Sequence, residues 1–565
     1  MPGTKKVWWI GVGALALAAC TVGPNYKQPK VDTPPAFVTT RGSGVSPLLS
    51  PNAKQDSTAL EGPTPRPGGE VIETWWSQFQ DPELTSLLTR ALAQNRDLKI
   101  AIARVREARA ERVVAGGALL PQLEATAGYN RSRGSKNVII PLGGSAAPSG
   151  GASSSSSKGA SSSNSPSALH PNVASGSSAG AGVADPGSPT SGTGSASSSG
   201  LPPGGPASPF GEGGLPGVTT NLYQTGFDAV YEFDLFGGTR RTLEAADAQA
   251  AAAVEGEHGV QLSLLAEVAS SYLQLREAQS REKIARENLQ AERAQWKIAD
   301  DKFHNGLGNE SQAAQQGAQV HLTEATLPPI AAQEQSARQA LAFLLAEDPN
   351  ALDSELAAPQ TLPNLPPELP LGVPSDLLRR RPDVRQAERQ LAAAYAEIGV
   401  ATAQLFPQFS ITGAFGFDSS KPGNLLNWAS HYYSVAPGIQ WPILNWRSLE
   451  AGISVQNAAE DEALLTYQSA VSQALKDVQD ALVQYESERV RHVALESAAL
   501  DARRAFDVAQ QTESEGLADQ IGTLDAERTR LQIEDSLAQS DASLRLDLIS
   551  LYKALGGGWT TLTAN

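Results

Sequence analysis

Few side chains in this 565-residue sequence are placed to do chemistry. Its six histidines are scattered and have neither the HExxH pattern nor any other metal-ligand spacing. No nucleophile and base converge in its motifs, and the single cysteine excludes an internal disulfide. We therefore expect no catalytic residue, no metal site and no enzymatic activity.

The single cysteine, Cys20, lies where a covalent lipid would be attached. Residues 7–19 are apolar and too few to span a bilayer as a mature helix. They end in Leu-Ala-Ala before Cys20, which is similar to a bacterial lipoprotein cleavage site. We expect residues 1–19 to be a signal peptide and Cys20 to carry the acyl anchor; an ordinary signal peptide is the alternative. Thr21 next to it, by similarity to known lipoproteins, favours the outer membrane.

Charge and composition limit the possible partners. The formal net charge of -16, without a basic stripe, argues against nucleic acid. Residues 134–217 are rich in Ser, Gly, Ala and Pro and carry little charge. Such a segment cannot bury enough apolar surface to offset its ordering entropy, so we predict a disordered loop.

A strand that leads into a very long helix occurs twice in the sequence. Residues 226–235 alternate apolar and polar side chains, and the chain that follows forms helix with no proline before Pro328. The same alternation recurs at 433–443, and RSLEA at 447–451 matches RTLEA at 241–245. We infer an internal duplication.

Segment lengths decide the expected architecture. Two further strands are predicted near 122–130 and 409–418. A helix over 240–303 would be about 96 Å long, and return helices over 310–346 and 383–405 would together reach about 90 Å. Strands of about ten residues suit a tilted bilayer crossing, yet four cannot close a barrel and lipid excludes open edges. Several chains must therefore pool their strands: two would give eight, and three would give twelve.

The expected organisation has six parts. They are a signal peptide (1–19), an extended lipid-anchored segment (20–75), a first strand–helix repeat with the inserted extracellular loop 134–217 (76–350), a proline-rich linker (351–374), a second repeat (375–559) and a tail (560–565).

Short motifs in a fixed order carry a family resemblance. They are CTVGPNY at 20–26, WSQFQDPEL at 76–84, LRRRPD at 378–383, LDA at 524–526 and ALGGGW at 554–559. With the duplicated frame, the chain resembles the TolC-like outer-membrane efflux factors, in particular their lipidated OprM-like (NodT-type) branch. The resemblance implies an α+β membrane protein. Its trimeric, twelve-stranded β-barrel, with four strands per chain, would continue into a long periplasmic α-helical barrel and include a mixed equatorial region.

The same resemblance implies a function. A homotrimer in the outer-membrane lipid would be the exit duct of a tripartite pump, working with a periplasmic adaptor and an inner-membrane RND-type transporter. It would need no cofactor besides the lipid on Cys20 and would conduct small toxic organic compounds. The alternatives are a periplasmic coiled-coil adaptor, or the outer-membrane channel of a type I secretion or metal efflux system. Strands with Tyr and Trp facing lipid would separate the channels from the adaptor.

Two glycine–leucine pairs match the family's periplasmic tips. The resemblance implies that adaptor hairpins dock at Gly306-Leu307 and at Gly516-Leu517. The alternative is that these glycines only cap the preceding helices.

An acidic residue matches the family's closed periplasmic aperture. The resemblance assigns that place to Asp525, which Arg528 can face at i+3; the alternative is a solvated helix face. The family often has a second acidic residue three positions earlier, where this chain has Gly522. Structural roles at the equatorial joint are implied for Arg380, Arg381 and Asp383.

Overall fold

A computed structural model describes most of the chain. The described residues are 21–29, 64–67, 74–133, 218–366, 368–372, 378–517 and 520–559. The predicted signal peptide, Cys20, the predicted loop 134–217 and the tail 560–565 lie outside them.

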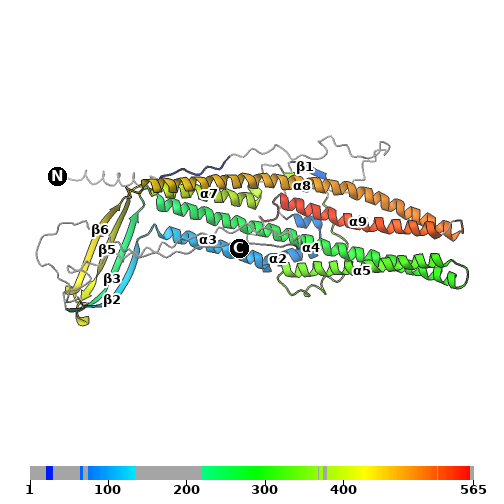
Figure 1. The fold of residues 1–565 in the computed structure, drawn as a ribbon, viewed down its shortest axis with the longest axis horizontal. Helices are drawn as coiled ribbons and strands as arrows, with labels where there is room; N and C mark the ends of the chain where they lie inside the picture. The colour runs from blue at the N-terminus through cyan, green and yellow to red at the C-terminus, as the bar shows by residue number, and fades with distance from the viewer. Residues whose placement is uncertain are drawn as a thin grey trace, which may run out of the picture. The chain divides into compact units, whose positions relative to one another are not determined.

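The element order repeats itself (Figure 1). The first half runs through α3 (Arg96–Gly117), β2 (Gln122–Arg133), β3 (Thr219–Phe233), α4 (Gly238–His304) and α5 (Glu310–Leu344). The second runs through α7 (Pro382–Ala403), β5 (Gln408–Ser419), β6 (His431–Gln440), α8 (Trp446–Ser514) and α9 (Gln520–Ala554). Helices α4 and α8 have 67 and 69 residues, and α5 and α9 have 35 each. The predicted duplication is confirmed.

The compact units cut across the two repeats. One unit, mostly helical, comprises residues 1–121, 232–409 and 439–565, and the other comprises 122–231 and 410–438. Each repeat thus gives its strands to one unit and its helices to the other.

The strand unit is a four-stranded sheet in the order β2-β3-β5-β6. Strand β3 begins at Thr219, seven residues before the predicted start, because its polar first half pairs antiparallel with the polar end of β2. There Tyr129 donates a hydrogen bond to Asn221 at 3.0 Å. Polar side chains on both faces give no alternation, so the pattern did not reveal this part of the strand. Several large apolar side chains of the sheet are exposed in the single chain: Leu123, Tyr129, Leu222, Phe227, Phe415, Tyr433 and Val435.

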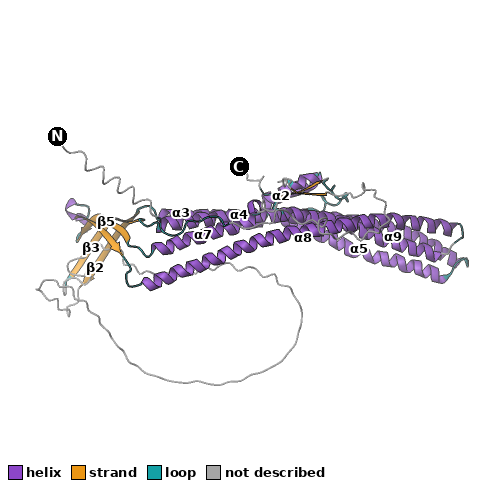
Figure 2. Cartoon of the chain, turned by 90° about the horizontal axis from the view of Figure 1, so that it is seen from above, coloured by secondary structure: helices purple, strands orange, loops and turns teal. Residues whose placement is uncertain are grey.

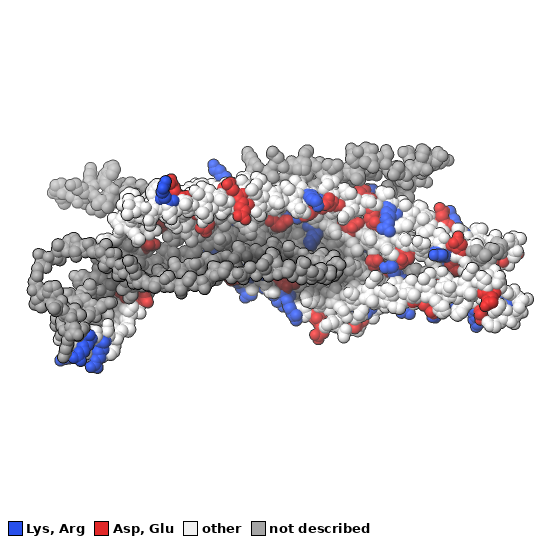
Figure 3. All heavy atoms as spheres, viewed as in Figure 1, with Lys and Arg blue, Asp and Glu red and all other residues white. Residues whose placement is uncertain are grey.

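In the helical unit, α4 packs against α3, α5, α7 and α9, and α8 packs against α7 and α9 (Figure 2). The predicted pairing of the first long helix with two shorter return helices is confirmed. Along α8, Val471, Val478 and Tyr485 are buried at seven-residue spacing and form an apolar seam. Among the described residues, no helix combines the length and the apolar character that a membrane crossing needs. Acidic and basic side chains are interspersed over the visible face of the helices (Figure 3).

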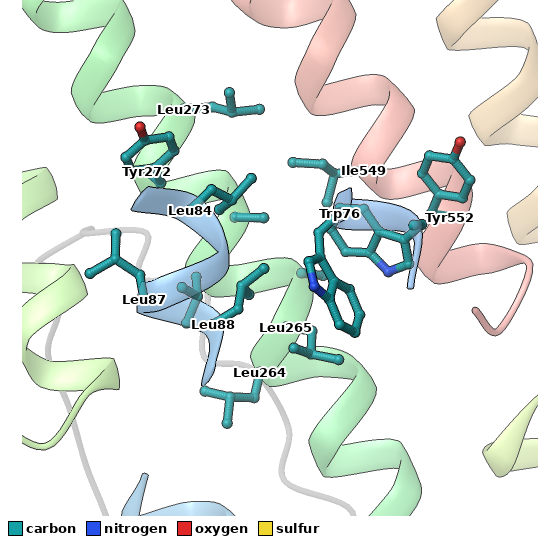
Figure 4. Packing of buried hydrophobic residues seen from close by; sticks show 14 of the residues in the cluster. Trp76, Leu84, Leu87, Leu88, Leu264, Leu265, Tyr272, Leu273, Ile549 and Tyr552 are labelled. Carbon is teal, nitrogen blue, oxygen red and sulfur yellow. The ribbon is translucent and has the colours of Figure 1, made fainter. Parts of the chain in front are cut away.

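A hydrophobic core lies where α2 (Pro82–Gln94) and the short 3-10 helix η2 (Trp75–Phe79) meet α4 and α9 (Figure 4). Asp81 caps α2 by accepting hydrogen bonds from the amides of Glu83 and Leu84 at 2.9 and 3.0 Å. Its other oxygen accepts one from the Tyr272 hydroxyl at 2.7 Å. Trp75 stacks on Tyr552 of α9, with ring centroids 5.4 Å apart. Gln78 of the WSQFQDPEL motif also accepts a hydrogen bond from the Tyr552 hydroxyl at 2.8 Å. The motif and the tryptophan directly before it therefore tie η2 and α2 to α9.

One pairing was not predicted. Strand β1 (Thr64–Pro67), in the segment expected to be extended, pairs parallel with β4 (Glu368–Gly372), in the linker expected to be irregular. Both stretches contain proline, which argues against a central strand but is compatible with a two-stranded sheet where each strand has a free edge.

Candidate functional site

The two helical hairpins of this unit turn in the same way. At the α4–α5 turn, the Gly306 amide donates to the Phe303 carbonyl at 2.9 Å, and the Leu307 amide donates to Lys302 at 2.8 Å. At the α8–α9 turn, Gly516 donates to Glu513 and Leu517 donates to Thr512, both at 2.9 Å. Both glycines are left-handed, with φ of 70° and 73°. This is the Schellman arrangement, and it explains why each turn needs glycine.

The leucine after each glycine is free of packing. Leu307 is 82% exposed and Leu517 is 75% exposed, although a residue at this place usually packs back on the helix that it caps. A Cβ added to Gly306 or Gly516 would meet nothing within 4 Å. Figures 1 and 2 show both turns at the same end of the helical unit. Capping thus accounts for the glycines, whereas two exposed leucines at one end form an apolar surface suited to binding another protein.

Asp525 and Arg528 lie near that end, on α9, and both are exposed. Within the described part of the chain, neither side chain forms an ion pair, so the i+3 pair that the sequence allowed is absent here. Arg528 instead lines a groove of about 520 Å³ between α4, α5 and α9. The ion pair between Arg281 and Asp535, at 2.8 Å, also borders this groove.

A pair of buried carboxyl groups lies between these helices, and neither was predicted from the sequence. Glu527, two residues after Asp525, is 2% exposed, and Glu292 of α4 is 1% exposed. Glu292 accepts hydrogen bonds from Thr323 at 3.0 Å and from Gln319 at 3.2 Å. Glu527 accepts only a long one, from Gln295 at 3.4 Å. The second oxygen of each carboxyl group is buried without a hydrogen-bond partner among the described residues.

Burial controls the protonation of this pair. Desolvation first, and then the charge of Glu292, raise the pKa of Glu527 to about 7, against a smaller opposing effect of Arg530. The pKa of Glu292 is also raised by burial, and its hydrogen bonds to Thr323 and Gln319 oppose the shift. Arg530 is mainly engaged elsewhere, in an ion pair with Glu534 at 3.0 Å. The site can therefore take up a proton near neutral pH.

The sequence held only a weak signal for these groups. Thr523 and Glu527 are four residues apart and both face the helix seam, but neither is apolar. Hydrophobic periodicity does not reveal a seam whose buried residues are polar.

Comparison with known proteins identifies the family. A model of the outer membrane efflux protein family matches residues 87–167, 190–347 and 373–557, which is most of the chain. The chain belongs to this family. Its members' channel function excludes the alternative of a periplasmic adaptor, and this family member is an outer-membrane efflux channel.

Several relatives cover most of the efflux channel. Pyoverdine export outer membrane protein OpmQ of Pseudomonas aeruginosa is 29% identical over 490 residues, 86% of this chain and 88% of that protein. Outer membrane protein OprJ of the same species is 30% identical over 329 residues, 58% of this chain and 68% of that protein. Cation efflux system protein CusC of Escherichia coli is 24% identical over 546 residues, 97% of each. The solved outer-membrane channel OprN has a TM-score of 0.72 at 31% identity, over 96% of this chain and 100% of that one.

The arginine motif of this efflux channel has a structural place. Arg381, before α7, donates to Asp383 at 2.7 Å, to Asp477 of α8 at 2.9 Å and to the Ala554 carbonyl of α9 at 3.0 Å. The Arg380 carbonyl accepts a hydrogen bond from the Trp559 indole at 2.8 Å. These contacts join α7, α8 and α9, in agreement with the structural role that the resemblance implies for the motif.

Proposed function

We propose that three copies of this efflux channel pool their strands into a twelve-stranded barrel and form the exit duct of a tripartite pump. Each chain supplies four strands whose large apolar side chains are exposed. Lipid excludes unpaired backbone groups, so such a sheet must close with strands of other copies. The resemblance to TolC-like factors favours three copies.

The pair of leucine tips is the observation that carries the rest of the proposal. Leu307 and Leu517 lie at equivalent turns of the two repeats and are exposed at one end of the helical unit. In a trimer the six tips would form one ring. We propose that the hairpins of a periplasmic adaptor bind this ring and connect it to an inner-membrane transporter.

Substitution of both leucines tests the docking. Leu307→Asp with Leu517→Asp places charges on the apolar tips without disturbing the glycine turns. The double variant should lose efflux, so that cells become as sensitive as a deletion strain, while the amount and heat resistance of the oligomer stay normal. Leu500→Asp, at an exposed leucine within α8, is the matched control and should retain efflux. Full efflux by the double variant would contradict docking at the tips.

We also propose that Asp525 forms the aperture ring. In a trimer its carboxylate would occur three times near the tips, where like charges repel one another unless a cation offsets them. Because Arg528 does not pair with Asp525 within one chain, the partner would be Arg528 or another basic group of a neighbouring chain.

Small organic toxicants are the proposed cargo. The sequence contains one methionine, Met1, and one cysteine, Cys20, so thioether and thiolate ligands for Cu(I) are absent from the rest of the chain. CusC belongs to a cation efflux system and TtgI of Pseudomonas putida to a toluene efflux pump, so relatives with this fold serve cations as well as organic toxicants. A deletion strain should become sensitive to organic toxicants. Sensitivity to copper or silver alone would overturn this assignment.

A further inference from the structure

The first described residues of the chain pack against the turn that joins β3 to α4. We call this binding site for the N-terminal segment the seat. The Val22 amide donates to the Phe236 carbonyl at 3.0 Å, so the segment is bonded to the turn that joins strand to helix. Further along, the Tyr26 hydroxyl donates to Glu388 of α7 at 3.2 Å. The segment thus bridges the joint and α7, all within the helical unit.

Arg241 of α4 is the main donor to this segment. It is 3% exposed, and its guanidinium donates to the carbonyls of Val22 and Gly23 at 3.3 Å each, and to the Asn25 side chain at 2.7 Å. A further bond to Glu244 at 2.7 Å neutralises its charge. A buried guanidinium needs such acceptors, and three of the four come from residues 22–25.

Missing side chains make room for these contacts. A Cβ on Gly399 of α7 would lie 2.8 Å from the Arg241 side chain. A Cβ on Gly23 would lie 2.5 Å from the Gly399 backbone, and Gly23 has a left-handed φ of 92°. Arg241, α7 and the N-terminal segment therefore fit together only because residues 23 and 399 are glycines.

The internal duplication supplies a comparison. Arg447 occupies the corresponding place in the second repeat, in the first turn of α8, but it is exposed. Its side chain forms neither a hydrogen bond nor an ion pair with any other residue that the structure describes. The repeat alone thus does not require a buried arginine at this place; what Arg241 has and Arg447 lacks is contact with residues 22–25 and with Gly399 of α7.

We propose that Arg241 is a positioning residue that holds Thr21–Asn25 against the β3–α4 joint, and so fixes the attachment point of the lipid next to this joint. The seat follows from the contacts of Arg241. Its role for the lipid rests on the proposed acylation of Cys20, one residue before Thr21. With these contacts intact, the lipid is attached close to the β3–α4 joint. Without them, it would be attached to a flexible N-terminal segment.

Hydrogen exchange of the full-length channel in detergent tests the seat. In Arg241→Ala, the Val22 amide should exchange at least about tenfold faster than in the wild type, because its segment loses three hydrogen bonds to a buried charge. Gly23→Ala should have the same effect, because its Cβ would clash with Gly399 and displace the segment, while the sequence of the helices stays unchanged. Arg447→Ala is the control and should leave Val22 protected. Unchanged protection in both Arg241→Ala and Gly23→Ala would overturn the proposal, as would equal loss in Arg447→Ala.

Labelling with radioactive palmitate separates the seat from the anchor. Label on the wild type together with a protected Val22 supports the whole proposal. A protected Val22 on an unlabelled chain would refute the lipid's placement and leave the seat standing. A labelled chain whose Val22 exchanges freely would refute the seat and leave the anchor standing.

Discussion

The buried carboxyl pair predicts that acidification strengthens the packing of α9 on α4. The pKa of Glu527 is about 7, compared with 4.5 for an ordinary glutamate. A buried carboxyl with a raised pKa imposes no penalty below pH 4.5, a growing penalty between pH 4.5 and 7, and its full penalty above pH 7. By linkage, the penalty on folding stability is about 2 kcal/mol at pH 6 and about 3 kcal/mol at pH 8.

Glu527→Gln removes this penalty because the amide stays neutral at every pH. We expect the variant to be more stable than the wild type at pH 8, by up to about 3 kcal/mol, and less so at lower pH. The charged groups that act on Glu527 are Glu292 of α4, Glu513 of α8 and Arg530 of α9. The repulsion between Glu527 and Glu292 is one cause of the raised pKa, so it is already contained in this gain.

Hydrogen exchange of peptides from residues 520–535 measures the effect. Comparing wild type and variant at each pH cancels the chemical pH dependence of exchange. Between pH 6 and pH 8, the wild type should lose roughly five- to tenfold more protection than Glu527→Gln, as about 1 kcal/mol requires. Asp507→Asn changes an exposed carboxylate of the neighbouring helix α8 and should behave as the wild type. Equal pH slopes for wild type and Glu527→Gln would refute the reasoning.

Three further predictions concern the anchor, the insert and the aperture. Cys20→Ser should abolish labelling by radioactive palmitate, and label on the serine variant would contradict acylation at this residue. Deletion of residues 140–210 should leave trimer stability and efflux near normal, because loop shortening costs little, and protease added outside wild-type cells should cut within the segment; complete resistance would argue against its exposure. In planar bilayers, Asp525→Ala should raise the open probability and weaken cation selectivity, and wild-type values of both would place the gate elsewhere.

Most of the fold could be predicted because its signals are local and repeated. The alternation near 226–235 and 433–443 and the long stretches of helix-forming sequence indicated the two repeats directly. Glycines at 306 and 516 indicated both hairpin turns, because the residue that ends a helix often has a left-handed conformation, which glycine adopts most readily. The docking role of these tips rests on the family resemblance and stays a prediction.

The missed features depend on contacts between distant parts of the chain. Strands β1 and β4 are about 300 residues apart and pair through their backbones, which leave no mark on side-chain patterns. Glu527 is buried because α4 covers it, and a single glutamate in α9 does not reveal its partner Glu292. Arg241 and Arg447 occupy matching motifs, yet only Arg241 is buried, beneath residues 22–25 and against Gly399 of α7.

The number of chains in the assembled channel tests the account most directly, because four strands per chain must be completed by other copies. Native mass spectrometry of the purified full-length channel, released from detergent micelles, measures this number. We expect a complex of three identical chains that stays intact after its release from the micelle. A monomer or a dimer as the intact species would contradict the twelve-stranded channel and, with it, the ring of tips proposed for docking.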